Sequence, residues 1–123
     1  MATHRLAHYA SDERPWGNFE RFTEDEPSTV KIITVKAGEE TSLQSHKHRE
    51  EFWHIISGRG TAVVGDEQLD APAGSEFFVA REVKHRLGGG AEGMVLLEIA
   101  FGDFDENDIT RFEDRYGRAD DTA

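Results

Sequence analysis

Residues 38–58 constrain the fold and the chemistry of this chain more than any other segment. Between the two glycines that bound it lie Gln44, His46 and Glu51, and a further histidine, His85, follows far downstream. Alternate residues of a β-strand project from one face, so Gln44 and His46 share a face. An amide oxygen, a carboxylate and two imidazoles are ligands suited to a divalent transition metal. The segment therefore predicts a metal site inside a small β-barrel, with ordinary surface histidines as the alternative.

The composition predicts a folded single domain without sulfur chemistry. The chain has 123 residues, of which 37% are hydrophobic and 10% aromatic, enough for one packed core. The absence of cysteine excludes disulfides, thiolate metal sites and cysteine nucleophiles. We expect a flexible N-terminal arm at residues 1–13 and a single domain at residues 14–123. Neither a membrane span nor a signal peptide is visible, so we expect a cytoplasmic protein that makes no membrane contact.

The net charge restricts the partners. With 14 Lys plus Arg against 25 Asp plus Glu, the formal charge is −11, which argues against nucleic acid or anionic membranes as ligands. Basic residues nevertheless surround the histidine segments, namely Lys47, Arg49, Arg81, Lys84 and Arg86. A basic opening would suit a small anionic ligand such as a sugar phosphate. The alternative is ordinary solvated charge at strand ends.

Short segments rich in valine, isoleucine and threonine, separated by glycine turns, predict an all-β sandwich or jelly-roll barrel. We expect strands at residues 18–22, 29–36, 41–47, 51–57, 61–64, 68–71, 75–80, 85–87 and 94–101. The glycines at positions 58 and 60 are expected to close one strand and begin its hairpin partner. Ile109 and Phe112, three residues apart, predict one or two helical turns, or an ordered tail, near the C-terminus.

The motif spacing resembles that of the cupin superfamily. Residues 38–58 follow the first cupin motif, with Gln44 in place of its first histidine. Residues 74–89 follow the second motif, with Ala80 and Glu82 where proline and glycine are usual. The resemblance implies a double-stranded β-helix (jelly-roll) fold. It also implies a divalent metal cofactor, zinc favoured and Mn, Fe, Co or Ni possible, held by Gln44, His46, Glu51 and His85.

More narrowly, the chain resembles the type II mannose-6-phosphate isomerase domain of bifunctional mannose-1-phosphate guanylyltransferase/mannose-6-phosphate isomerase enzymes. The motifs that carry this resemblance span most of the chain and include residues 14–17, 42–49, 65–67, 84–87, 108–114 and 116–118. The resemblance implies a metal-dependent aldose–ketose isomerase that interconverts mannose 6-phosphate and fructose 6-phosphate. It also implies a homodimer.

Further site residues follow from this resemblance and from alternation. His48 is our first candidate for the catalytic base, or a fifth metal ligand, and Lys84 is the second candidate base. Arg14 and Arg118 are candidates for binding the substrate phosphate, which also places Arg118 in the catalytic set. Their alternative role is a structural salt bridge. Trp53 is a candidate wall of the substrate pocket, or a core residue.

Two other functions remain open at this point. The chain could be a non-catalytic sugar- or metabolite-binding cupin that keeps the metal and the pocket but lacks a base. It could also be another cupin metalloenzyme, such as an iron or manganese dioxygenase. Dioxygenases of this superfamily usually offer three histidines and a glutamate, so Gln44 counts against that alternative.

Overall fold

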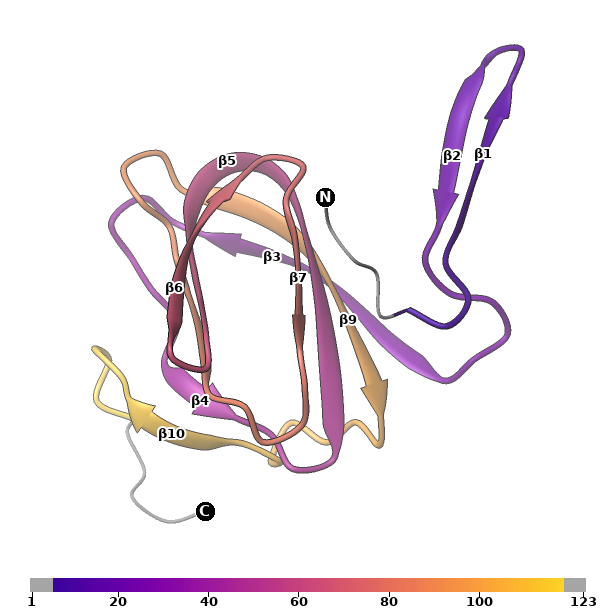
Figure 1. The fold of residues 1–123 in the computed structure, drawn as a ribbon. Coiled ribbons are helices and arrows are strands. Elements are labelled where there is room, and N and C mark those ends of the chain that lie inside the picture. The colour runs from indigo at the N-terminus through magenta and orange to yellow at the C-terminus, as the bar shows by residue number, and fades with distance from the viewer. Residues whose placement is uncertain (1–5, 119–123) are drawn as a thin grey trace.

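The computed structural model describes residues 6–118, which form ten β-strands and no helix (Figure 1). The all-β prediction is therefore confirmed, and no helix of the described residues is long and apolar enough to cross a membrane. The strands are β1 (Ala10–Arg14), β2 (Gly17–Arg21), β3 (Ser28–Val35), β4 (Leu43–Ser45), β5 (Arg49–Val64), β6 (Glu67–Pro72), β7 (Glu76–Val79), β8 (His85–Gly88), β9 (Met94–Gly102) and β10 (Thr110–Glu113).

Strand β5 organises the barrel because it belongs to two sheets. Its first half pairs with β9 and β7, and its second half pairs with β6 and β8. The hairpin predicted between residues 51–57 and 61–64 is therefore wrong. Gly58 adopts a φ of +79° just after the register with β9 shifts, so the strand bends and continues instead of turning back.

Alternation along the paired strands decides which side chains face the barrel interior. Odd-numbered positions of β5 from 51 to 55 and even-numbered positions of β9 from 94 to 100 point inward and are buried. The apolar inner core contains Val35, Trp53, Ile55, Ala62, Ala71, Val79, Leu87, Met94 and Leu96. This core fills one end of the barrel and leaves the polar inward residues at the other end.

A second apolar cluster lies on the outer face of β5 and β9. Leu6 packs there with Phe52 and Ile99, so part of the predicted arm at residues 1–13 docks on the barrel. The same segment also contains β1, which forms an antiparallel hairpin with β2. This hairpin projects away from the barrel in Figure 1 and carries Trp16 at its turn, with the side chain largely exposed.

The predicted C-terminal helical turns are wrong, because this segment forms strand β10. Thr110 and Arg111 pair with Ser45 and Gln44 of β4, so the sheet supplies the backbone partners that a helix would otherwise provide. A bulge at Phe112 interrupts the register. Two apolar residues three apart are too short a pattern to specify a helix against pairing with an available strand edge.

Strand β3 forms an edge of the described sheet, where it pairs only with β9. Val30 and Ile32 project outward from it and are more than half exposed. The predicted homodimer stays a prediction.

We predict that two glycine substitutions separate backbone strain from steric overlap. Gly58 and Gly74 both have positive φ, but a Cβ at Gly74 meets open space, whereas one at Gly58 overlaps the carbonyl oxygen of Gly93. Gly74→Ala should lower the free energy of unfolding by about 1–2 kcal/mol. Gly58→Ala should lower it by roughly 3 kcal/mol or more. Urea denaturation measures both, and equal losses would contradict the proposed close packing of β5.

Candidate metal centre

Three of the predicted ligands meet inside the barrel. His46 follows β4, Glu51 lies in β5 and His85 begins β8, and one ligand atom of each lies within 4.8 Å of the others. The His46 Nε2 atom is 3.2 Å from Glu51 Oε2, and the His85 Nε2 atom is 3.4 Å from Glu51 Oε1. All three residues are buried. The fold therefore gathers two imidazoles around one carboxylate from three separate segments of the chain.

Hydrogen bonds on the far side of each imidazole orient its Nε2 atom toward Glu51. His46 Nδ1 is 2.6 Å from the carbonyl oxygen of Asp108, and His85 Nδ1 is 2.9 Å from that of Val83. A carbonyl oxygen only accepts, so each Nδ1 atom carries the hydrogen and each Nε2 atom presents a lone pair. The His85 Nε2 atom is buried and has no hydrogen-bond partner. This donor set fits a divalent transition metal.

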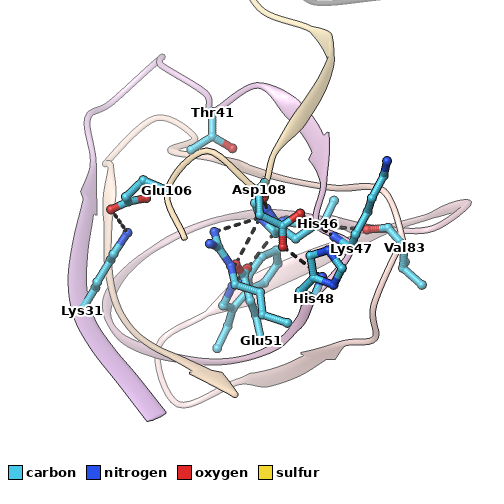
Figure 2. A network of polar contacts seen from close by, with 12 residues as sticks. Lys31, Thr41, His46, Lys47, His48, Glu51, Val83, Glu106 and Asp108 are labelled. Carbon is cyan, nitrogen blue, oxygen red and sulfur yellow. Dashed lines mark hydrogen bonds and ion pairs between the residues drawn. The ribbon is translucent and has the colours of Figure 1, made fainter. Parts of the chain in front are cut away.

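Asp108 also holds the turn that carries His46. Its Oδ1 atom accepts the backbone N–H of Lys47 and its Oδ2 atom that of His48, each at 2.9 Å (Figure 2). His46 Nδ1 also contacts the carbonyl oxygen of Asp108. Through these contacts, the segment ahead of β10 holds the first cupin-like motif in place. Sequence reasoning noted this acidic residue only as part of a family motif, because its partners lie far away in the chain.

Arg49 and Trp53 donate hydrogen bonds to the central carboxylate. Arg49 Nε is 3.2 Å from Glu51 Oε2, its Nη2 atom is 3.2 Å from His46 Nε2, and Trp53 Nε1 is 3.2 Å from Glu51 Oε1. Burial alone would raise the pKa of Glu51. The contacts that Glu51 makes with His46, His85 and Arg49 outweigh the effect of burial and lower that pKa to about 2. Glu51 is therefore ionised, as a metal ligand must be.

Glu98 is a buried site residue that sequence reasoning missed. It projects from β9 into the same cavity, beside Glu51. Burial raises the pKa of Glu98, and the nearby Glu51 carboxylate raises it further, to about 7. A signal was present in the sequence, because Glu98 is the one charged residue of an otherwise apolar strand.

Gln44 lines the same cavity, where it is the cross-strand neighbour of His85. The cavity has a volume of about 160 Å³ and contains His46, Glu51 and His85 in its wall. A second, more open cavity of about 610 Å³ adjoins it. Both cavities are lined by Ile33, Thr41, Gln44, Ile109 and Arg111. The candidate metal centre thus lies in a small recess that opens beside a larger one.

The two candidate bases do not line these cavities. Strand β4 ends at Ser45, so alternation does not extend to His48, which lies exposed in the following turn. Lys84 is also exposed, and its Nζ atom lies 4.3 Å from the centroid of the Phe112 ring. The roles predicted for both residues stay predictions.

The candidate substrate-binding residues occupy three different environments. Trp53 is buried in the wall of the inner cavity, beside Glu51, and packs edge-on against His85. Arg118 lines the outer cavity and is paired with Asp114 at 2.8 Å. Arg14 lies in the projecting hairpin, exposed and paired with Asp12, and lines neither cavity.

The chain is similar to known proteins over most of its length. The family described as "Mannose-6-phosphate isomerase C-terminal" matches residues 2–114. The chain is 40% identical over 107 residues to the xanthan biosynthesis protein XanB of Xanthomonas campestris, covering 85% of this chain and 23% of that protein. It is 36% identical over 107 residues to the mannose-1-phosphate guanylyltransferase ManC of Salmonella typhimurium, covering 85% of this chain and 22% of that protein.

Solved structures support the fold. A cupin protein from Bacteroides fragilis superposes with a TM-score of 0.57 at 23% identity, covering 66% of this chain and 74% of that one. The cupin fold predicted from the motif spacing is therefore confirmed. The chain spans less than a quarter of the length of the curated relatives named above. By its match over residues 2–114, the chain belongs to the family of mannose-6-phosphate isomerase C-terminal domains, and this chain has the cupin fold.

Proposed function

We propose that this domain is a metal-dependent sugar-phosphate isomerase that interconverts mannose 6-phosphate and fructose 6-phosphate. The observation that carries the proposal is the buried group of His46, Glu51 and His85 in the wall of a cavity. Membership of the family adds the substrate class. A cytoplasmic location, where sugar phosphates are made, is part of the proposal.

The chain would hold the ion through the two Nε2 atoms, a Glu51 oxygen and the side-chain oxygen of Gln44. Zinc suits this set of nitrogen and oxygen ligands, and Mn, Fe, Co or Ni also bind such sets. When bound, the ion supplies a positive charge that polarises the sugar carbonyl and stabilises the negative charge of an enediolate. Arg49 and Trp53 keep the Glu51 carboxylate ionised and oriented.

Isomerisation also requires a group that moves a proton between C1 and C2 of the sugar. Such a group has to face the cavity that holds the substrate carbonyl. The carboxyl side chains of Glu98 and Glu106 line the inner cavity, whereas His48 and Lys84 do not. His48→Asn and Lys84→Met variants test directly whether either predicted base takes part in turnover.

We predict that the stripped protein binds one divalent ion at this centre. Trp53 donates to Glu51, so titration with Co²⁺ should quench the fluorescence of this buried indole, while exposed Trp16 contributes a constant background. His46→Ala should weaken the affinity at least about tenfold through loss of a ligand. His54→Ala is the matched control, because His54 lies on the outer face, where it pairs with Glu76. Equal effects of the two substitutions would contradict the assignment.

We predict metal-dependent isomerase turnover in a coupled assay that starts from mannose 6-phosphate. The stripped protein should be inactive and should regain turnover with zinc or another ion of the set. Glu51→Ala should reduce kcat/KM at least about 100-fold, because several kcal/mol of charge stabilisation are lost. His54→Ala should retain turnover.

Two results would count against this function. Turnover that survives both chelation and Glu51→Ala would contradict the metal-dependent mechanism. Tight metal binding without turnover on mannose 6-phosphate would favour the non-catalytic binding cupin, and dioxygen consumption with a loaded iron or manganese ion would favour a dioxygenase.

A further inference from the structure

A row of side chains leads from the candidate metal centre to the outer cavity. Strand pairing places Gln44 of β4 opposite His85 of β8 on one side and opposite Arg111 of β10 on the other. Residues directly opposite in paired strands share one face of the sheet. Adjacent strands are about 4.8 Å apart, so the backbone of Arg111 lies roughly 10 Å from that of His85. Arg111 lines both cavities, at the point where they meet.

Arg111 differs from most of the described arginines because its guanidinium has no acid partner. In residues 6–118, the other arginines form ion pairs with carboxylates, with the exception of the exposed Arg81. Arg111 forms neither an ion pair nor a side-chain hydrogen bond with the described residues, and its Nε atom is buried without a partner. A buried N–H donor without an acceptor is costly, and an arginine that carries one in a cavity wall is suited to receive an acceptor from a ligand.

Four of the five acids that line the two cavities are paired with other basic residues, and the fifth, Glu98, lies beside Glu51. In the outer cavity, Glu39 and Glu40 lie within 3.6 Å of Arg115. In the inner cavity, Glu51 is bound by Arg49, and Glu106 by Lys31 at 3.0 Å. The guanidinium of Arg111 is therefore a positive charge that remains available to an anionic ligand, in a chain of net charge −11.

We infer that Arg111 binds the phosphate group of the substrate while the sugar carbonyl reaches the metal centre. This inference rests on the proposed function and deepens it. A guanidinium presents two parallel N–H donors that match two oxygens of a phosphate monoester. Its place one strand beyond Gln44 suits a ligand whose anionic group is several bonds from its carbonyl, as in a hexose 6-phosphate. It also makes Arg111, rather than the paired Arg14 or Arg118, the principal anion-binding residue within this chain.

The test compares Arg111→Gln and Arg111→Lys with Arg59→Gln as the matched control. Arg59 is an exposed arginine paired with Asp70, and it lines neither cavity. Isothermal titration calorimetry of the zinc-loaded full chain with mannose 6-phosphate, mannose and inorganic phosphate measures affinity without requiring turnover. Zinc content and thermal melting are recorded for each variant.

Arg111→Gln should raise the Kd for mannose 6-phosphate and for inorganic phosphate roughly 10- to 100-fold, since a charge-assisted pair of bonds is lost. Binding of mannose and zinc should be unchanged. Arg111→Lys should recover part of the affinity, because it keeps the charge but not the planar pair of donors. The melting temperature of Arg111→Gln should equal or exceed that of the parent, since an unpaired donor is removed.

The inference is overturned if Arg111→Gln binds mannose 6-phosphate like the parent, or if its affinity falls no more than that of Arg59→Gln. It is also overturned if the parent binds neither phosphate ligand, or if Arg111→Gln melts lower and loses zinc, which would make Arg111 a structural residue. Phosphate affinity that depends on Arg111 without any isomerase turnover would support the inference and reject the proposed reaction. Turnover with an unchanged KM in Arg111→Gln would support the proposed reaction and overturn the inference.

Discussion

The buried carboxylate of Glu51 is the interaction on which the rest of this structure depends. An ionised group removed from water costs several kcal/mol unless it is paired and hydrogen-bonded. Arg49, Trp53, His46 and His85 surround it, and His46, His85 and Arg49 together lower its pKa to about 2 despite burial. Positive charge at this point is therefore a requirement of the fold. A divalent ion would meet the same requirement with the lone pairs that the two imidazoles present.

The candidate centre also explains why the end of the chain matters to a site built mainly from its middle. Asp108 holds the turn of His46, and β10 pairs with β4, the strand of Gln44. The inner recess and the outer cavity therefore share a wall that only this C-terminal segment completes. Loss of residues 108–113 would remove Arg111 together with the Asp108 contacts that hold His46.

The sequence was sufficient for the features that depend on short-range pattern. Motif spacing and alternation predicted the all-β cupin fold and the meeting of His46, Glu51 and His85. The sequence was insufficient where pairing between strands far apart in the chain overrides the local residue pattern. The turn after Ser45 removes His48 from the ligand face, and the segment predicted to be helical pairs with β4 as a strand. Arg111 could not be singled out, because its lack of a partner is visible only once every other charge has been placed.

The most direct test of the central claim is anomalous diffraction from crystals of the zinc-loaded protein. The account predicts one strong zinc peak inside the barrel, at about 2.0–2.2 Å from the Nε2 atoms of His46 and His85 and from a Glu51 oxygen. Gln44 should complete the coordination from β4. A barrel interior without zinc, with Arg49 still bridging Glu51 and His46 as the sole positive charge, would contradict it.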